Sequence, residues 1–187
     1  MDFYLLIFSV LIGIIMIAST PFQAQSSASY DESYRPQFHY SAPTMWLNDP
    51  NGLVYYKGEY HLFYQYHPDA LTWGPMHWGH AISTDLVHWE TLPIALYPDD
   101  IGTIFSGTVV IDAENTSGLL PDGGLVAVYS YNTQAQGVAY SVDRGRTWTK
   151  YTGNPVLPAL EKDFRDPKVF WHSATQRWVM IIVAGRE

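Results

Sequence analysis

The stretches Gly79-His-Ala-Ile-Ser-Thr-Asp-Leu-Val-His-Trp89 and Gly137-Val-Ala-Tyr-Ser-Val-Asp-Arg-Gly-Arg-Thr-Trp148 are two versions of one motif. Gly, Ala, Ser, Asp and Trp recur in the same order, at an offset of 58 residues before one inserted residue and 59 after it. A second pair, Asp49-Pro50 and Asp166-Pro167, is separated by 117 residues, or two such periods, with Phe105-Ser106-Gly107 midway. The sequence therefore predicts a structural repeat of about 58 residues.

Each period contains short runs rich in Val, Ile, Tyr, Phe and Trp, bounded by Gly, Pro, Asn and Asp, a pattern typical of β-strands and turns. The clearest runs are Gly52–Tyr56, Glu59–Tyr66, His77–Ser83, Leu125–Tyr131, Gly137–Val142 and Trp178–Val183. No long segment has helical periodicity, so we expect an all-β domain. About four strands per period is the composition of a β-propeller blade.

The period divides the chain into two full blades, roughly 49–106 and 107–165, and a third that begins at Asp166. A propeller needs at least about four blades to close. We therefore expect residues 29–187 to be the N-terminal part of a propeller, truncated to about two and a half blades.

Composition narrows the class of ligand. The net charge is −8, charged residues make up 15% of the chain, aromatic residues make up 16%, and there is no cysteine. An acidic chain without a basic cluster argues against nucleic-acid binding, and the absence of cysteine excludes disulfides and Cys-ligated metals. His77 and His80 are three apart on an expected strand and point to opposite faces, so we expect no metal site and no cofactor. A neutral polar ligand such as a sugar fits this composition.

The N-terminal segment has the pattern of a secretory signal. Leu5–Ala18 is almost wholly apolar, at 14 residues too short for a typical span of about 20, and small polar residues follow it. We expect residues 1–28 to be a cleaved signal peptide of a secreted protein, without membrane attachment in the mature form. The alternative is an uncleaved membrane anchor.

The repeat also predicts where polar side chains meet. Asp49, Phe105-Ser106 and Arg165-Asp166 occupy equivalent places at the start of three consecutive blades. The innermost strands of neighbouring blades run side by side around one axis, so these positions converge on one mouth of the channel. Two carboxylates and an arginine at one site are suited to glycosidic bond cleavage, which uses paired carboxylates.

Three blocks resemble the signatures of glycoside hydrolase family 32, the β-fructofuranosidase family of invertases, inulinases and levanases. They are Trp46-Leu47-Asn48-Asp49-Pro50-Asn51-Gly52, Phe105-Ser106-Gly107 and Phe164-Arg165-Asp166-Pro167-Lys168. The resemblance implies a five-bladed propeller followed by a β-sandwich that this chain does not include. It also implies hydrolysis of sucrose or fructans with retention, Asp49 being the nucleophile and Asp166 the transition-state stabiliser.

The resemblance assigns further contacts. The residues implied to bind substrate, together with Arg165, are Trp46, Asn48, Gln65, Trp73, Phe105 and Ser106. The family's acid/base is a Glu in a Glu-Cys block well downstream of the Arg-Asp-Pro block. The chain to Glu187 has no cysteine and hence no such block, so we expect this chain alone to lack general acid catalysis.

Local chemistry adds four expectations. Asn51-Gly52 is a tight-turn pair that would follow Asp49. Arg165 would keep the carboxyl of Asp166 ionised. The amide of Gln65, on a strand among bulky aromatics, would point to the channel, because an unpaired buried amide is costly. The repeated Ser, Asp and Trp (Ser83, Asp85 and Trp89; Ser141, Asp143 and Trp148) resemble Asp-box turns, with structural roles.

Three other functions are open from the sequence. The chain could be a non-catalytic sugar-binding or pseudoenzyme propeller. It could belong to another propeller glycosidase, although a sialidase needs an arginine cluster and only Arg165 lies near the expected mouth. It could also belong to a fructosyltransferase, which shares the fold and both Asp roles.

Overall fold

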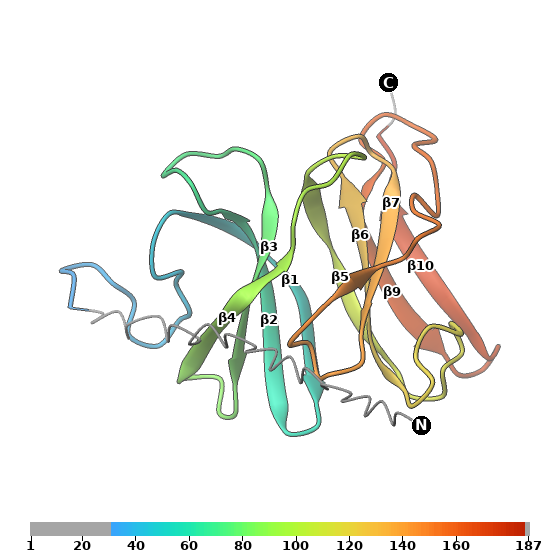
Figure 1. The fold of residues 1–187 in the computed structure, drawn as a ribbon, viewed down its shortest axis with the longest axis horizontal. Helices are drawn as coiled ribbons and strands as arrows, with labels where there is room; N and C mark the ends of the chain where they lie inside the picture. The colour runs from blue at the N-terminus through green and yellow to red at the C-terminus, as the bar shows by residue number, and fades with distance from the viewer. Residues whose placement is uncertain (1–30, 186–187) are drawn as a thin grey trace, which may run out of the picture.

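The computed structural model describes residues 31–185, whose regular elements are all β-strands (Figure 1). The first sheet contains β1 (Trp46–Tyr56), β2 (Glu59–His67), β3 (His77–Ser83) and β4 (Trp89–Leu96). The second contains β5 (Ile104–Asp112), β6 (Gly124–Tyr131), β7 (Gln136–Ser141) and β8 (Thr149–Lys150). The third contains β9 (Arg165–His172) and β10 (Arg177–Val183).

These sheets confirm the predicted all-β class and the four-stranded repeat. Both complete sheets are antiparallel and ordered along the chain, and the third starts at the predicted boundary. Within residues 31–185 no helix is long and apolar enough to cross a membrane. The expected signal peptide, residues 1–28, lies outside the described residues.

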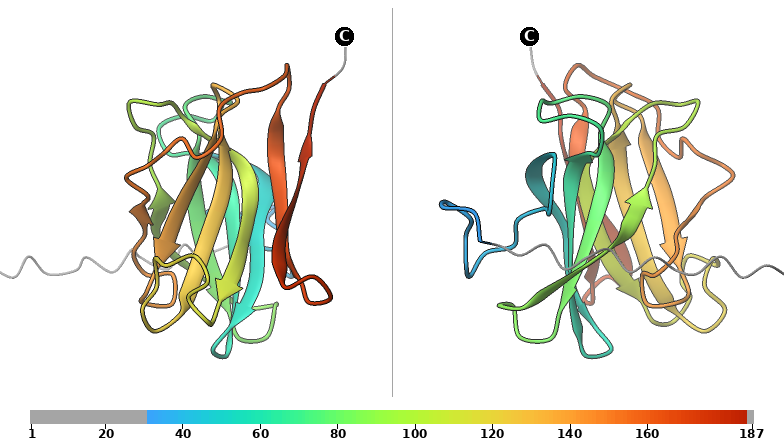
Figure 2. Two further views of the ribbon diagram at one scale, coloured as in Figure 1. Left: turned by 90° about the vertical axis from the view of Figure 1, so that its right-hand side faces the viewer. Right: turned by 60° about the vertical axis from the view of Figure 1, so that its left-hand side comes forward.

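The first strands of the sheets are neighbours in the order β1, β5 and β9. Figures 1 and 2 show the sheets standing side by side with their strands roughly upright, and the loops between β2 and β3 and between β4 and β5 at the upper end. Equivalent positions near the start of β1, β5 and β9 therefore lie close together, as inner strands of adjacent blades require.

An aromatic core fills the space between the first two sheets. Phe63 and Trp78 of the first sheet pack in one buried cluster with Ile104 and Tyr129 of the second. The rings of Trp78 and Tyr129 meet edge to face with centroids 6.0 Å apart. Burial of large aromatic side chains contributes strongly to stability, so this core fixes the relative position of β1 and β5.

β1 departs from the sequence prediction. It begins at Trp46, so Asp49 lies inside the strand, and Asn51-Gly52 is not a turn. The pairing of β1 with β2 shifts register between Asn48 and Pro50 and again between Asn51 and Val54, and Gly52 has φ of +54°. These irregularities are bulges, which re-aim side chains within a strand.

The Asp-box prediction is confirmed at both repeats. Asp85 accepts hydrogen bonds from the backbone N–H groups of Val87 and His88, and Asp143 accepts one from Thr147 N–H. The two indoles close their own turns, Trp89 Nε1 on Leu86 O at 3.2 Å and Trp148 Nε1 on Gly145 O at 3.1 Å. The Asp and Trp side chains thus stabilise the turns between β3 and β4 and between β7 and β8. They lie away from the starts of β1, β5 and β9.

Candidate active site

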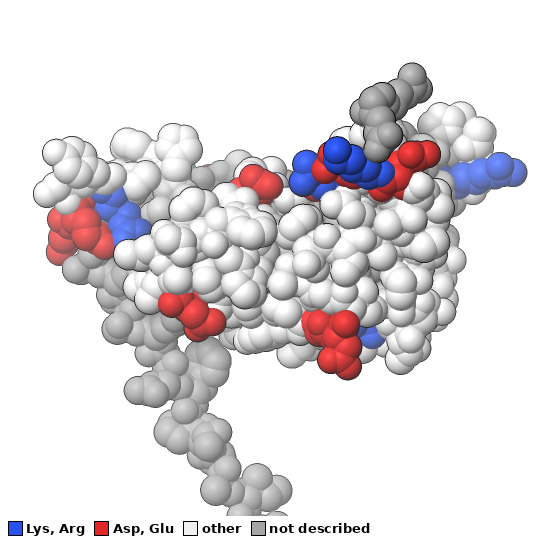
Figure 3. All heavy atoms as spheres, turned by 90° about the horizontal axis from the view of Figure 1, so that it is seen from above, with Lys and Arg blue, Asp and Glu red and all other residues white. Residues whose placement is uncertain are grey.

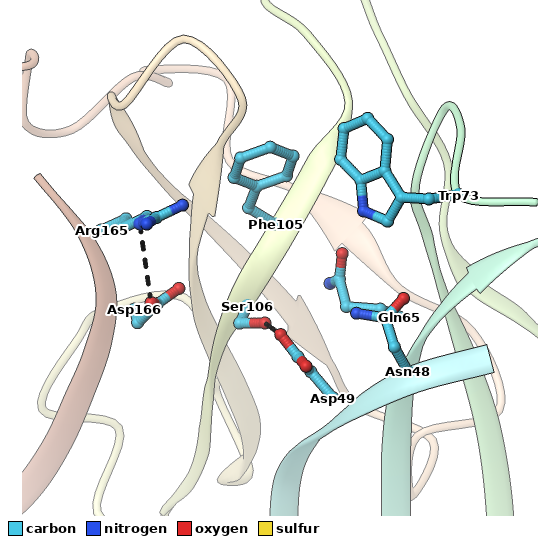
Figure 4. Close-up of a pocket in the computed structure, with 8 residues that line it drawn as sticks. All are labelled: Asn48, Asp49, Gln65, Trp73, Phe105, Ser106, Arg165 and Asp166. Carbon is cyan, nitrogen blue, oxygen red and sulfur yellow. Dashed lines mark hydrogen bonds and ion pairs between the residues drawn. The ribbon is translucent and has the colours of Figure 1, made fainter. Parts of the chain in front are cut away.

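A pocket of about 240 Å³ opens where β1, β5 and β9 begin (Figure 4). Its lining contains eight of the nine predicted site residues: Asn48, Asp49, Gln65, Trp73, Phe105, Ser106, Arg165 and Asp166. Drug-sized ligands occupy pockets of about 300–1,000 Å³. The volume enclosed by these residues is therefore suited to one small ring, such as a monosaccharide unit.

Two hydrogen bonds join the β1 and β5 sides of the pocket. Ser106 Oγ donates to Asp49 Oδ2 at 3.1 Å, as the dashed line in Figure 4 shows. Further along the same two strands, Gly107 N–H donates to Asn51 Oδ1 at 3.2 Å. The Asp49 carboxylate is therefore held at one oxygen, Oδ2, by a hydrogen bond from the neighbouring sheet.

Asp166 lies across the pocket from Asp49, at the start of β9, with its side chain about half exposed. Burial raises the pKa of Asp166, the Arg165 guanidinium lowers it, and the negative charge of Asp49 raises it further. The net direction of the pKa is upward, so the lowering effect of Arg165, which the sequence predicts, is present but is outweighed by burial.

The geometry of Arg165 explains its limited effect. Its Nε is 3.9 Å from Asp166 Oδ2, and its guanidinium also contacts Asp163 Oδ1 at 3.4 Å. The cation is thus shared between two carboxylates and is itself 42% exposed. Solvent screening weakens such an exposed pair, so desolvation of Asp166 outweighs it.

Two aromatic side chains form one wall. Trp73, from the loop between β2 and β3, is 59% exposed, and its ring meets that of Phe105 edge to face at 6.2 Å. The carbonyl of Phe105 accepts a hydrogen bond from the buried indole of Trp78 at 3.0 Å. The wall therefore has a fixed member, Phe105, and an accessible one, Trp73, on which a sugar ring can stack.

Gln65 and Asn48 supply the uncharged polar groups. Gln65 lines the pocket and is 3% exposed, and its Nε2 has no hydrogen-bond partner within residues 31–185. Asn48 Oδ1 accepts a hydrogen bond from Trp46 Nε1 at 2.7 Å. Trp46 itself is not among the lining residues, but its indole orients Asn48, which is. The direct contact of Trp46 with substrate stays a prediction.

The sequence reasoning missed Ser130 and Gln136, which lie behind the entry of β9. Asp166 N–H donates to Ser130 Oγ at 3.0 Å, and Gln136 Nε2 donates to Phe164 O at 2.9 Å. The repeat could have indicated Gln136, because this residue stands one period of 58 residues after Trp78, which donates to the carbonyl of Phe105.

Few charged side chains surround the site. Seen from above, most of the described surface is uncharged, and the Lys and Arg side chains lie in separate small groups (Figure 3). Arg165 is the one cation among the described residues that line the pocket. Within residues 31–185 no three His, Cys, Asp or Glu side chains are grouped to hold a metal ion.

Comparison with known proteins adds independent information. The family model described as glycosyl hydrolases family 32 N-terminal domain matches residues 39–187. The chain is 61% identical over 168 residues to a levanase of Bacillus subtilis (strain 168), covering 87% of this chain and 25% of the levanase. It is 46% identical over 184 residues to an extracellular exo-inulinase of Aspergillus awamori, covering 82% of this chain and 34% of the inulinase.

The fold of this chain also matches a solved structure. The β-fructofuranosidase of Schwanniomyces occidentalis complexed with fructosyl-erythritol superposes with a TM-score of 0.75 at 46% identity. The match covers 79% of this chain and 31% of that protein. The chain thus spans about a third or less of the length of these relatives.

Proposed function

Because this chain belongs to glycosyl hydrolase family 32, we propose that it forms part of the catalytic domain of an enzyme that hydrolyses β-D-fructofuranosidic bonds with retention of configuration. The observation that carries the proposal is a single pocket lined by Asp49 and Asp166 together with an aromatic wall and a buried amide. The relatives' names support fructans or sucrose as the substrate class.

In this mechanism Asp49 attacks C2 of the fructosyl ring and forms a covalent fructosyl–enzyme intermediate, which water then hydrolyses. The hydrogen bond from Ser106 orients one oxygen of Asp49 and leaves the other for the attack. Such positioning can account for a large part of a rate enhancement.

Asp166 stabilises the positive charge that develops on the sugar ring in the transition state. The transition state resembles an oxocarbenium ion, and a carboxylate that accepts hydrogen bonds from the ring hydroxyls stabilises it more than the ground state. Arg165 donates to the same sugar or to Asp166, and the sugar supplies an acceptor for Gln65 Nε2, which has none among the described residues. The acid/base is supplied by the Glu that the family resemblance places further along the polypeptide.

We further propose the setting of this domain. The three sheets are successive blades of a five-bladed propeller, because their first strands follow each other around one side of the pocket. The enzyme is secreted through the signal-like segment of residues 1–28, and one similar protein is named as an extracellular exo-inulinase.

The test is product analysis with the complete natural polypeptide that contains this sequence. Incubation with sucrose, inulin and levan should release free fructose, and the Asp49→Ala variant should release none. Fructosyl oligomers in place of free fructose would assign a transferase, and binding without turnover would assign a non-catalytic sugar-binding protein.

A further inference from the structure

Two fully buried polar side chains lie outside the pocket lining, directly behind Asp166. Ser130 on β6 and Gln136 on β7 are paired across these strands, and neither is exposed. Ser130 Oγ donates to Gln136 Oε1 at 2.7 Å. Burial of polar groups is costly unless each is hydrogen-bonded, so the remaining contacts of this pair are informative.

Those contacts converge on residues 164–166. Gln136 Nε2 donates to Phe164 O at 2.9 Å and to Gln134 O at 3.0 Å. Both hydrogens of the amide are thereby used, so its oxygen is the group that accepts from the Ser130 hydroxyl. The Ser130 oxygen in turn accepts from Asp166 N–H at 3.0 Å. The network is complete and has one possible direction.

The backbone that this network holds is unusual. Asp166 has φ of +60°, in the left-handed region that non-glycine residues adopt uncommonly, although Asp enters it more readily than most. Such conformations persist where surrounding contacts fix them, and they cluster at functional sites. Ser130 and Gln136 bind the chain on either side of Arg165, at the N–H of Asp166 and at the carbonyl of Phe164.

The first sheet contains the equivalent of one of these two contacts, the hydrogen bond to the Phe carbonyl. Trp78, one period before Gln136, donates its indole N–H to the carbonyl of Phe105, which stands one period before Phe164. The cross-strand partner of Trp78 is Gln65, whose amide faces the pocket, whereas the partner of Gln136 is Ser130, which binds Asp166. The third strand thus holds the entry of the next sheet in both repeats, and the second sheet adds a contact specific to Asp166.

We propose that Ser130 and Gln136 are positioning residues for Asp166: they fix its left-handed backbone and so aim its carboxylate at the reacting sugar. The inference rests on the proposed function, in which Asp166 stabilises the transition state. Neither side chain is among the residues that line the pocket, so their effect passes through the backbone of residues 164–166, which carries Asp166. Loss of positioning should therefore slow the chemical step more than it weakens substrate binding.

The experiment compares Ser130→Ala and Gln136→Met with Ser141→Ala in the complete natural polypeptide. Ser141 is a matched control, since it is 2% exposed, lies on the same sheet and has its own hydrogen bonds to Asp143 and Gly145. A misplacement near 1 Å can cost about 100-fold in rate. We expect kcat on sucrose or levan to fall at least about tenfold in both test variants with KM changed less than about threefold.

Ser141→Ala should lose thermal stability to a similar extent while its kcat stays within about twofold of wild type. Wild-type kcat in Ser130→Ala, an increase confined to KM, or an equal kcat loss in Ser141→Ala would each overturn the inference. A crystal structure of Ser130→Ala supplies the second measurement: the carboxylate of Asp166 should be displaced, and an unmoved carboxylate would also overturn it. If the wild-type polypeptide cleaves no fructoside, the proposed function fails, and the structural comparison still decides whether Ser130 holds Asp166.

Discussion

Ser106 Oγ on β5 donates a hydrogen bond to Asp49 Oδ2 on β1, over 3.1 Å and across the boundary between two sheets. The two residues are 57 positions apart in the chain, about one repeat, and each lies near the start of its strand. Asp49 is the nucleophile in the proposed mechanism, and its support by the adjacent repeat unit depends on the packing between the two units. The chemistry of the site and the stability of the sheet interface are therefore coupled.

Asp49 should carry the covalent intermediate. A fluorinated fructosyl probe, which slows hydrolysis of the intermediate, should add one fluorofructosyl mass to the peptide that contains Asp49, read by mass spectrometry of the complete polypeptide. Asp49→Ala should abolish labelling and turnover while fructose binding persists. Label on Asp166 in the wild type would reverse the two assigned roles.

The charge of Arg165 should extend activity to lower pH. Arg165 lowers the pKa of Asp166, against the raising effects of burial and of Asp49. Its removal in Arg165→Gln should raise that pKa further, so that Asp166 becomes protonated, and kcat is lost, at a higher pH than in wild type.

The control is Arg165→Lys, which keeps the positive charge, and the measurement is kcat from about pH 3 to 7, across the usual range of carboxyl titration. The acidic limb of Arg165→Lys should stay close to that of wild type. Equal profiles for wild type and Arg165→Gln would show that Asp166 does not govern this limb.

Gln65 should lower the stability of the folded protein and increase its affinity for fructose. Its buried Nε2 has no acceptor in the part of the chain that the structure describes, and an unsatisfied buried donor costs about 1–3 kcal/mol. Gln65→Met keeps the approximate shape and removes the donor, so urea unfolding should show a gain of about 1 kcal/mol. The affinity for fructose should fall by about tenfold, because a hydrogen bond in the complex is lost.

The exposed Gln37 provides a control, since Gln37→Met should change neither quantity. A loss of stability in Gln65→Met would mean that Nε2 is already satisfied, by water or by another group. Unchanged fructose affinity would remove Gln65 from the binding site.

The repeat in the sequence was sufficient to predict the site because a repeated unit places equivalent residues at equivalent points in space. Asp49, Phe105-Ser106 and Arg165-Asp166 were grouped by this argument, and the structure brings them into one pocket. Their roles in catalysis are proposals that the variants above test.

What the sequence could not predict depends on cross-strand partners. Asn51-Gly52 favours a turn locally, but pairing with β2 absorbs it as a bulge. The pKa of Asp166 sums burial, a cation and a second carboxylate, of which the sequence displays only the adjacent Arg165. Ser130 and Gln136 are common residue types whose importance arises from full burial behind Asp166.

A buried histidine pair between the first two sheets makes stability depend on pH. The rings of His61 and His80 are stacked, with His61 Nδ1 and His80 Nε2 3.1 Å apart, so one ring donates its hydrogen to the other. Neither side chain is more than 1% exposed, and His61 Nε2 has no hydrogen-bond partner within the described residues. Glu59 Oε2 is 3.9 Å from that atom, but Glu59 is already paired with Arg144 and Arg146.

Burial lowers the pKa of His61 to about 4, against the attraction of Glu59 and together with repulsion from Arg146 and Arg144. Burial also lowers the pKa of His80 well below its usual range, and the charge of His61 adds to the effect. Both folded-state values lie below the unfolded value of about 6.5, so between pH 6.5 and 4 the unfolded chain binds protons that the folded protein does not. Stability is therefore full above about pH 6.5 and falls as the pH decreases toward 4, by roughly 3 kcal/mol for His61 alone.

The prediction is tested by urea unfolding of the purified protein between about pH 4 and 7.5, a range that brackets the two pKa values of His61. His80→Gln removes one titrating group and one of the two like charges that an acid solution would place side by side, so its stability should decline less steeply with falling pH, whatever its stability at pH 7.5. His39→Gln is the control, since His39 is exposed on the lead-in segment, and its pH slope should equal that of wild type. Parallel curves for wild type and His80→Gln would show that the buried pair does not govern the acid sensitivity of this sheet interface.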